Sequence, residues 1–460
     1  TSGDTIAAIA TPSGVGGIGL IRVSGPGAET LARRLFRPSR PLAAFRSHQL
    51  YHGEIVSPRT GSVLDDVLVA LLKGPRSYTG EDTLEVSCHG GPLILRTVLE
   101  EILAAGARPA QRGEFTKRAL LNGRLDLSQA EAVLDLITAQ TRGGIAAAAS
   151  RVRGDLSARI GKARDALIDL LADVEASIDF SPEDGVEALP QEARAGFQTL
   201  VDDLTTLAST YRRGRITRLG AAIVIVGRPN VGKSSLLNCL LGEQRAIVTP
   251  IPGTTRDFIE ETVEIGGLPV RLVDTAGIRQ PENAIERAGI DLVGERLAAA
   301  DAVLVLLDGS AELTAEDCGL LTGGEGKPPL PVINKADLPQ RLDEGSLRGR
   351  LPETAAPPIR ISAKYGTGIE GLTAAIRDLL LAAPPEEEPE VMIAHLRHKV
   401  ALERAAAAVA RGRDALRDGS APELAALELR EALAALGEIT GSTATEEVIE
   451  RIFSRFCVGK

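Results

Sequence analysis

Apolar and polar residues alternate at two different periods along the chain, and the changes of period divide it into regions. Residues 1–121 hold short apolar runs of strand length at 18–23, 67–72 and 83–87, with one helical run at 92–105. This mixture predicts an N-terminal α+β domain over residues 1–121. Residues 14–19 match the dinucleotide pattern G-x-G-x-x-G, but a strand follows where that site requires a helix, so we predict a turn.

From residue 122 the apolar period becomes that of a helix. Ser128-Gln129-Ala130-Glu131 fits a capping box and predicts a helix start. Apolar residues then recur at steps of three and four from Ile145 to Ile178, which predicts one helix about 50 Å long. A further stripe runs from Phe197 to Tyr211. We therefore predict part of a helical domain over 122–214, followed by a basic, glycine-containing hinge, RRGRITRLG.

Residues 221–241 change from a strand pattern to a helix pattern within one stretch. Between the two, Gly227 to Ser234 fits G-x-x-x-x-G-K-[ST]. In such a loop the backbone N–H groups surround a phosphate, Lys233 reaches the β and γ oxygens, and Ser234 ligates Mg²⁺. A glycine-rich turn without a ligand would fit this pattern alone, so the prediction of a nucleotide site needs further motifs.

Three further motifs each follow a predicted strand. The first is Asp274-Thr275-Ala276-Gly277, in which a carboxylate would hold the Mg²⁺ shell and a glycine N–H would sense the γ-phosphate. The second is Asn334-Lys335-Ala336-Asp337, whose carboxylate can accept two hydrogen bonds from the N1 and N2 edge of guanine, whereas adenine has no such donor pair. The third is Ser362-Ala363-Lys364, where a backbone N–H would meet the base oxygen. Alone, the first fits a turn and the second a helix cap; together they predict GTP.

The region after residue 384 is helical again. A proline and acid-rich linker, residues 382–390, ends the GTPase segment, and apolar stripes follow at 424–439 and 448–456. Stripes on both sides of the GTPase segment need a partner, so we expect them to pack together. The sequence thus predicts a multidomain α/β protein in which a Ras-like P-loop GTPase domain, 215–384, is inserted into a discontinuous helical-bundle domain, 122–214 and 385–460.

Composition narrows the class of protein. The 460 residues suffice for about three domains. The net charge of −10 gives no global attraction to nucleic acid. The four cysteines lie far apart without a C-x-x-C pair, which argues against a zinc ribbon or a disulfide framework and predicts a reducing compartment. Without a leader pattern or a long apolar run, we expect a cytoplasmic protein that does not enter a membrane.

The four nucleotide motifs resemble those of the TRAFAC-type translation-related GTPases. Other stretches are more specific: ATPSGVGGIGLIRVSG, SYTGEDTLEVSCHGG, NGRLDLSQAEAV, GRPNVGKSSLLN, PGTTRD and the terminal FCVGK. Together they resemble the MnmE (TrmE) family of tRNA-modifying GTPases over essentially the whole chain. The terminal phenylalanines also predict that the C-terminal tail is held against the protein rather than frayed.

The resemblance implies a homodimer formed through an N-terminal domain that is similar to folate-binding folds. That domain would hold 5-formyl- or methylene-tetrahydrofolate at Arg22, Glu85, Arg124 and Lys460. Family members more often have lysine where this chain has Arg124, so the charge is kept but the ligand geometry can differ. By composition alone these residues, like His89, would be ordinary surface or loop groups.

The family also implies a partner and a substrate. With the flavoprotein MnmG, which supplies FAD, its members modify C5 of the wobble uridine of certain tRNAs by adding a (carboxymethyl)aminomethyl group. Cys457, next to the C-terminus, is a candidate nucleophile whose activating base the sequence does not identify.

Hydrolysis would require a group in place of the glutamine that many GTPases carry after their DTAG glycine, because Ile278 occupies that position. The resemblance implies Glu286, and it implies a K⁺ held by Asn230, Thr249, Ile251 and Thr254, with Thr255 joining Ser234 on Mg²⁺. Arg256 would otherwise fit an arginine finger in cis. The remaining nucleotide contacts implied are Val231, Gly232, Ser235, Pro250, Pro252 and Gly253.

Two other functions fit part of these observations. A ribosome-assembly GTPase would share the nucleotide motifs and act as a nucleotide-gated binding factor, although such proteins usually carry a basic RNA-binding domain. A folate-binding scaffold could use its GTPase only as a clock, with hydrolysis uncoupled from the modification.

Overall fold

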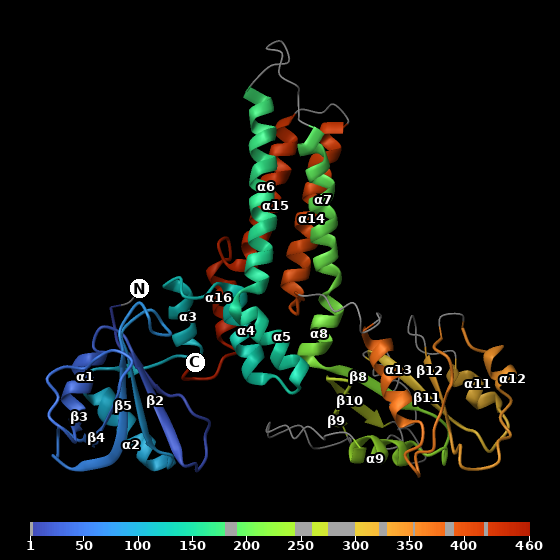
Figure 1. Cartoon of the computed structure of the whole chain (residues 1–460), viewed down its shortest axis with the longest axis horizontal. Helices are drawn as coiled ribbons and strands as arrows, with labels where there is room; N and C mark the ends of the chain where they lie inside the picture. Colours follow the sequence, from blue (N-terminus) through green and yellow to red (C-terminus); the bar gives the residue numbers. More distant parts are fainter. Residues whose placement is uncertain are drawn as a thin grey trace, which may run out of the picture. The chain divides into compact units, whose positions relative to one another are not determined.

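The structure is a computed structural model that describes residues 3–179, 191–243, 260–274, 300–321, 329–352, 355–381, 391–417 and 422–460 (Figure 1). The chain divides into two compact units. The first unit comprises Thr1–Leu134, Arg151–Asp165 and Arg430–Lys460, and the second comprises Asp135–Ser150 and Ala166–Leu429. Each unit contains one sheet. Four helices contribute residues to both units: α4 (Leu127–Thr138), α5 (Arg142–Arg153), α6 (Asp155–Asp179) and α15 (Pro422–Thr440).

The sheet of the first unit has seven strands in the order β3-β4-β5-β6-β2-β1-β7, antiparallel except between β1 and β7. One face packs against α1 (Ala28–Leu35) and α2 (Pro92–Ala104) through residues such as Ile21, Val69 and Val86. The predicted α+β domain is confirmed, and the strand after the glycine-rich stretch begins at Ile18. The strands are β1 (Ile6–Ile9), β2 (Ile18–Ser24), β3 (Phe36–Pro38), β4 (Leu50–Val56), β5 (Val63–Leu72), β6 (Thr83–His89) and β7 (Arg108–Pro109).

The helical segments of the first unit include α3 (Glu114–Leu121), the start of α4 (Leu127–Thr138) and α16 (Glu446–Phe453). Phe453 and Phe456 are buried against Leu127 and Ala130. The predicted capping box is shifted by two residues, because the side chain of Asp126, not Ser128, accepts from the Gln129 N–H at 2.9 Å, and the Gln129 side chain accepts from the Asp126 N–H in return. An aspartate carboxylate is at least as good an N-cap as a serine hydroxyl.

The single long helix predicted from Ile145 to Ile178 is wrong. Two helices, α5 (Arg142–Arg153) and α6 (Asp155–Asp179), meet at Gly154, whose φ of +96° lies in the left-handed region. That conformation ends an α-helix. The apolar spacing continues across the break because α5 and α6 each carry apolar residues at steps of three and four. The seam is also not buried throughout, since Ile145 and Ile178 are exposed at its two ends.

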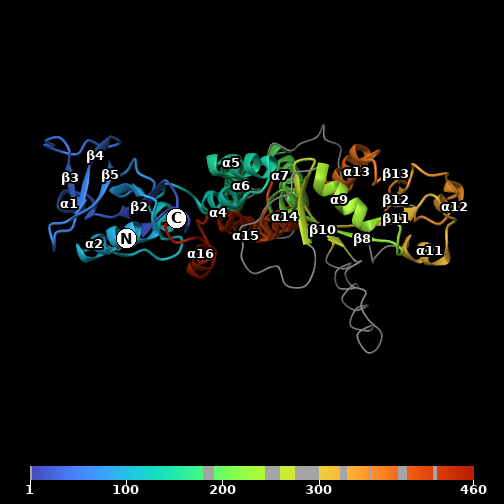
Figure 2. The ribbon, with the colours of Figure 1, turned by 90° about the horizontal axis from the view of Figure 1, so that it is seen from below.

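In the second unit α7 (Gln191–Ser209) and α14 (Leu396–Arg417) run side by side, as two views show (Figures 1 and 2). Phe197, Leu200 and Leu204 of α7 are buried as the stripe predicts. The stripe predicted on α15 (Pro422–Thr440) is partly wrong, because Leu424 and Leu427 are exposed. Alanines and Leu429, Leu436 and Ile439 form the buried face instead, since small residues let the helix pack closely.

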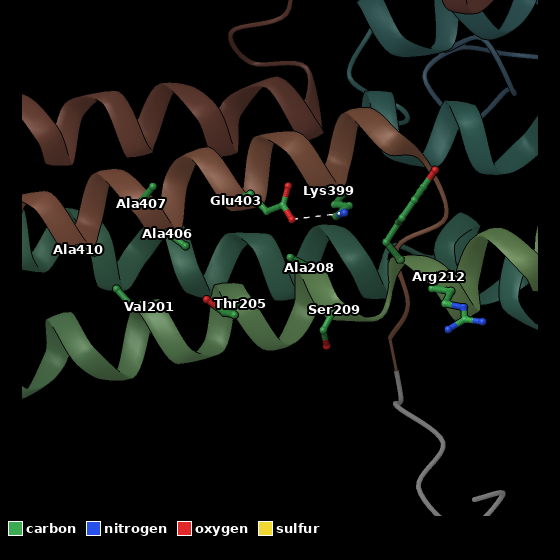
Figure 3. A pocket seen from close by; sticks show the side chains of 11 residues that line it. Val201, Thr205, Ala208, Ser209, Arg212, Lys399, Glu403, Ala406, Ala407 and Ala410 are labelled. Atoms are coloured by element: carbon green, nitrogen blue, oxygen red, sulfur yellow. Dashed lines mark ion pairs between the residues drawn. The ribbon is translucent and has the colours of Figure 1, made fainter. Parts of the chain in front are cut away.

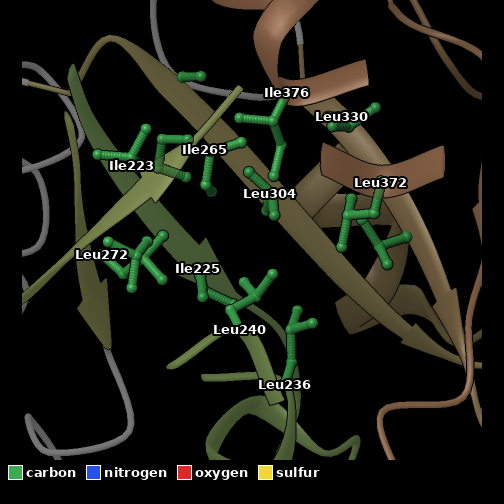
Figure 4. Close-up of a cluster of buried hydrophobic side chains, with 14 of the residues drawn as sticks. Ile223, Ile225, Leu236, Leu240, Ile265, Leu272, Leu304, Leu330, Leu372 and Ile376 are labelled. Carbon is green, nitrogen blue, oxygen red and sulfur yellow. The ribbon is translucent and has the colours of Figure 1, made fainter. Parts of the chain in front are cut away.

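The second sheet has six strands in the order β13-β12-β11-β8-β10-β9, all parallel except β9. Helices α9 (Lys233–Glu243) and α13 (Ile369–Leu381) cover one face through the apolar cluster of Figure 4. Helices α11 (Ala315–Leu321) and α12 (Glu344–Arg348) lie on the other face. The strands are β8 (Ala221–Val226), β9 (Glu260–Ile265), β10 (Leu268–Asp274), β11 (Ala302–Asp308), β12 (Pro329–Asn334) and β13 (Ile359–Arg360).

The predicted hinge before this sheet is a helix, α8 (Tyr211–Leu219), which leads through Gly220 into β8. The glycine within it, Gly214, does not provide flexibility. A Cβ at this position would lie 2.1 Å from the carbonyl oxygen of Ile393, so glycine is required for close backbone approach.

Candidate functional site

The predicted phosphate loop joins β8 to α9 at the carboxyl end of the parallel strands. Asn230 and Gly232 both have positive φ, +63° and +102°. Lys233 Nζ donates to the carbonyl oxygens of Gly227 at 2.7 Å and Arg228 at 2.8 Å, so its ammonium group lies over the loop. Together with the exposed Ser234 and Ser235 in the first turn of α9, these features make a site for an anion such as a phosphate.

Asn334, the last residue of β12, joins the phosphate loop to the third predicted motif. Its Nδ2 donates to the carbonyl of Val231 at 2.8 Å, and its Oδ1 accepts from the N–H of Ala363 at 2.9 Å. The residue is only 3 % exposed. A Cβ on Gly232 would lie 2.3 Å from Nδ2, so the glycine makes room for this contact. The structure thus brings together three motifs that are far apart in sequence.

The exposed carboxylate of Asp337 is oriented by the last of these motifs. Its Oδ1 accepts from Ser362 Oγ at 2.6 Å, and this bond is the main reason why the pKa of Asp337 lies below its ordinary value. An ionised carboxylate is purely an acceptor, which suits a base edge with two N–H donors. The neighbouring Lys335 has φ +64° and its Nζ lies 2.6 Å from Asp308 Oδ2. Lys364 Nζ lies 4.8 Å from the centre of the Tyr365 ring.

The sequence interpretation missed an anchor of the phosphate loop. Arg228 Nε donates to Asp317 Oδ1 of α11 at 2.8 Å, and the Asp317 side chain is 3 % exposed. This contact fixes the variable part of the loop to a helix on the opposite face of the sheet. The two residues lie 89 positions apart, and no local pattern connects them.

Several predicted site residues lie outside the described residues. Asp274 is the last residue of β10, but its side chain lies outside the described part of the structure. The others are Thr249, Pro250, Ile251, Pro252, Gly253, Thr254, Thr255, Arg256, Thr275, Ala276, Gly277, Ile278 and Glu286.

A second cluster of polar residues lies in the first unit, on the face of the sheet opposite α1 and α2. Arg22 of β2 and Glu85 of β6 are direct cross-strand partners, and Arg22 Nε and Nη2 donate to Glu85 Oε1 at 2.9 and 2.8 Å. Arg22 Nη1 also donates to the carbonyl oxygen of Gly459 at 3.5 Å. Burial first, and then the nearby Arg22 charge, hold the pKa of Lys460 below its ordinary value. Three of the four residues implied for folate therefore meet in one place.

Two aromatic rings that the sequence interpretation missed flank Arg22. The guanidinium carbon lies 5.7 Å from the centre of the Tyr78 ring and 5.9 Å from that of Phe115. Tyr78 Oη is within 2.9 Å of Thr116 Oγ1, and burial raises the pKa of the phenol. With only 8 Phe and 4 Tyr in 460 residues, an aromatic in the polar loop SYTGED was a signal that could have been used.

The fourth residue, Arg124, reaches the same region through the backbone. Its Nε donates to the carbonyl of Ser77, next to Tyr78, at 3.2 Å. The C-terminal tail is fixed as predicted, because Val458 forms a strand bridge with Arg112 and Phe456 is buried. Gly459 has φ +94°, and a Cβ on it would lie 2.4 Å from the carbonyl oxygen of Ile9. Arginine, glutamate, lysine and two aromatics thus surround one site.

The two cysteines of the first unit and His89 have different surroundings. Cys457 is exposed. Burial raises the pKa of the Cys88 thiol to about 12, so this group is not a thiolate at neutral pH. His89 Nδ1 lies 2.6 Å from Asp65 Oδ1, and this hydrogen bond raises the pKa of the His89 imidazole.

Within the described ranges no cluster of three or more His, Cys, Asp or Glu side chains forms a metal site, and no helix is long and apolar enough to cross a membrane.

Two protein families match this chain, one over its N-terminal domain and one over the remainder. Residues 5–124 match a family described as the GTP-binding protein TrmE N-terminus, and residues 127–457 match the MnmE helical domain family. The two matches together leave only short segments of the chain uncovered.

Full-length relatives carry one name. The tRNA modification GTPase MnmE of Syntrophus aciditrophicus is 52% identical over 457 residues, 99% of each chain. That of Heliobacterium modesticaldum is 48% identical over 466 residues and the whole of both chains. Among solved structures, a point variant of Aquifex aeolicus Era bound to GDP and AlF4⁻ is 28% identical over 40% of this chain and 66% of that chain, with a TM-score of 0.26.

Proposed function

Because the chain belongs to the MnmE family of tRNA modification GTPases, we propose that it uses GTP hydrolysis to drive modification at C5 of the wobble uridine in tRNA. The observation that carries this proposal is the convergence of the phosphate loop, Asn334 and the Ser362–Lys364 loop on one nucleotide site. The polar cluster of the first unit, formed by Arg22, Glu85, Arg124 and Lys460, would bind the folate.

In the nucleotide site, Lys233 leaves the loop carbonyls of Gly227 and Arg228 to contact the β- and γ-phosphates. The guanine base is read by Asp337, and a backbone N–H of the Ser362–Lys364 loop meets the base oxygen. ATP lacks the donor pair that Asp337 requires, so the site rejects adenine. Ser362 donates to the carboxylate and holds it in place.

We propose that the site binds two cations, held in part by residues outside the described ranges. Ser234, with Thr255 and the Asp274 shell, offers the hydroxyl and carboxylate oxygens that Mg²⁺ prefers. Asn230, held at φ +63°, with Thr249, Ile251 and Thr254, offers amide and carbonyl oxygens that suit K⁺. When bound, these cations supply positive charge to the oxygens that become more negative during phosphoryl transfer. Glu286 orients the attacking water.

In the first unit, Arg22 and Lys460 offer two cationic groups and Glu85 an acceptor, beside the Tyr78 and Phe115 rings. A tetrahydrofolate has a flat pterin with N–H donors and an anionic glutamate tail, so this combination suits it. The folate would supply the one-carbon unit. The flavoprotein partner MnmG would supply FAD and the reduction, and tRNA is the substrate of the joint complex.

The same domain is proposed to form the homodimer. Its sheet exposes large apolar side chains on the face away from α1 and α2, including Ile18 and Leu68, and Val15 in the adjacent loop is 90 % exposed. Burying such side chains is favourable, so a second copy is a suitable cover.

Two experiments test the proposal. First, GTP hydrolysis by the purified chain is expected to be faster in KCl than in NaCl at matched ionic strength, and equal rates would remove the K⁺ assignment.

Second, Glu286→Ala is expected to lower hydrolysis at least about 100-fold and to abolish the wobble-uridine modification in cells. Normal modification without hydrolysis would show that GTP turnover does not drive the chemistry. Co-sedimentation with ribosomal subunits would instead favour an assembly factor.

A further inference from the structure

The two chain segments that enter and leave the inserted nucleotide-binding part lie together in the second unit. Thr210 precedes α8, and its Oγ1 accepts from the N–H of Ile393 at 3.1 Å. One turn later, Gly214 allows the Ile393 carbonyl oxygen to approach its Cα. Two backbones in such close contact move as one, so the beginning and the end of the inserted part are held at a single joint.

A buried carboxylate on α4 binds both segments at this joint. Arg218 Nε, one turn beyond Gly214, lies 2.5 Å from Asp135 Oδ1, and His395 Nε2 lies 3.0 Å from Asp135 Oδ2. The Asp135 side chain is only 3 % exposed. A buried carboxylate depends strongly on its partners, because water cannot replace them.

Helix α8 is also connected to the strands of the nucleotide site. Arg215 of α8 pairs with Asp301, whose Oδ2 accepts from the N–H of Ala222 at 2.9 Å. Ala222 lies in β8, which leads to the phosphate loop. A Cβ on Gly220 would lie 2.6 Å from the carbonyl oxygen of Pro269 in β10, the strand that ends at Asp274. Any shift of these two strands therefore acts directly on α8.

Space for movement exists beside the joint. An open groove of about 570 Å³ lies between α7 and α14, next to the start of α8 (Figure 3). Tyr211, Arg212 and Lys399 line its end at the joint, and Lys399 Nζ lies 5.7 Å from the centre of the Tyr211 ring. Mostly small side chains of α7 and α14, four of them alanines, line the rest. The start of α8 therefore borders open space on the side of this groove.

We propose that Asp135 is a positioning residue that transmits the nucleotide state to the helical domain through Arg218 and His395. The inference rests on the proposed function, since it concerns the coupling of GTP hydrolysis to tRNA modification. A shift of β8 and β10 turns α8, and Arg218 carries that movement to Asp135 on α4. Because His395 holds the other carboxylate oxygen, the start of α14 follows the same movement. The domain thus responds as a unit.

The test compares two isosteric substitutions in the full-length chain. Asp135→Asn keeps the shape of the side chain and removes its charge, and Asp169→Asn makes the same change at an exposed position of α6. With Asp135→Asn, we expect GTP hydrolysis within about twofold of wild type but wobble-uridine modification in cells lowered about tenfold, within the usual range for coupling between sites. Asp169→Asn is expected to change neither. Modification at the wild-type level, or hydrolysis and modification lowered in equal proportion, would overturn the proposal.

Two further variants keep the test decisive. Arg218→Gln should reproduce the split, and the double variant with Asp135→Asn should be no worse than the more severe single one, because both remove one contact. An additive loss would contradict a shared contact. If Asp135→Asn does not fold, His395→Gln decides, since it leaves the carboxylate paired with Arg218 and must still lower modification more than hydrolysis. A wild-type chain without GTP hydrolysis would instead refute the proposed function.

Discussion

At the scale of a single residue, we propose that Asp337 determines the choice between guanine and adenine. Its ionised carboxylate can accept two N–H groups from one base edge, whereas an amide offers one acceptor and one donor. Asp337→Asn is therefore expected to weaken GTP binding about 100-fold and to favour XTP, whose C2 oxygen replaces the amino group. Titration calorimetry with both nucleotides measures this.

The control for that substitution is Asp343→Asn. Asp343 caps α12 in the same unit by accepting from the N–H groups of Gly345 and Ser346, both at 3.1 Å. Asparagine is a comparable N-cap, so GTP affinity and stability should both stay near wild type. Unchanged GTP binding in Asp337→Asn would mean that guanine is recognised elsewhere.

Glu114 of α3 makes the stability of the chain dependent on pH. Burial alone would raise its pKa, but ion pairs with Arg108 and Arg118 and the Gln111 N–H hold the pKa below its ordinary 4.5. A lowered carboxyl pKa stabilises the fold above about pH 4.5, and that stabilisation is lost as the pH falls through the folded-state pKa. Glu114→Gln should therefore lower the melting temperature at neutral pH and flatten its decline below about pH 5.

Thermal unfolding followed by circular dichroism at a series of pH values provides the measurement. Glu100→Gln changes an exposed carboxylate of α2 in the same unit and should leave the pH profile as in wild type. A parallel profile for Glu114→Gln and wild type would show that these ion pairs do not determine acid stability.

The residues that could be predicted from sequence are those whose motif fixes the chemistry locally. Lys233, Asn334 and Ser362 each belong to a recognisable motif that follows or ends a strand, and the structure brings these motifs together. The Arg228–Asp317 pair and the rings around Arg22 could not be predicted. Their partners come from distant segments, and their contacts depend on the fold rather than on spacing.

At the scale of elements, Gly154 determines where one helical seam becomes two helices. Its φ of +96° is unfavourable for any residue with a Cβ, so Gly154→Ala should lower the free energy of unfolding by about 1–2 kcal/mol. Gly161 lies inside α6 with no atom within 4 Å of the place that a Cβ would take, so Gly161→Ala should raise it by about 0.5–1 kcal/mol. Denaturant unfolding of the two variants should show opposite signs, and a shared sign would contradict this explanation.

The C-terminal tail is a second element whose backbone decides its role. In Gly459→Ala the new methyl group would meet the Ile9 carbonyl oxygen, a backbone atom that cannot easily move, so the tail and Lys460 must shift. We expect binding of 5-formyltetrahydrofolate to weaken at least about tenfold, because the shift displaces Lys460 and the Gly459 carbonyl oxygen that contacts Arg22. GTP binding should be unchanged.

Gly61→Ala is the matched control for the tail. Gly61 also has a positive φ, +73°, but no atom lies within 4 Å of its Cβ position. It should share the backbone strain without displacing the tail, and folate binding should stay near wild type. If both variants bind folate equally well, the tail is not part of that site.

Element type was more predictable than element boundaries. Strong periodicity located α2, α7 and the strand–loop–helix of the phosphate site correctly. The break at Gly154 and the helical state of residues 211–219 were not predictable, because a glycine can serve flexibility, a left-handed turn or close contact. Only the neighbours of Gly154 and Gly214 reveal which of these applies.

At the scale of the whole molecule, the family and its domain types followed from sequence, because motifs from both ends of the chain pointed to the same proteins. The joint between α8 and residues 393–395 did not. It depends on contacts across more than 170 residues, such as Thr210–Ile393 with a separation of 183 positions, which no local pattern encodes. The coupling that we infer there belongs to the assembled fold.

The most direct test of the account asks whether nucleotide binding in the second unit is required for the chemistry on tRNA. Lys233→Ala removes the ammonium group that donates to the Gly227 and Arg228 carbonyl oxygens and that we propose contacts the phosphates. The group is not part of the apolar core, so the chain should fold. Mass analysis of tRNA nucleosides from cells whose only copy carries this substitution is predicted to show wobble uridine without its C5 group. Fully modified uridine in those cells, at normal protein abundance, would contradict the central claim.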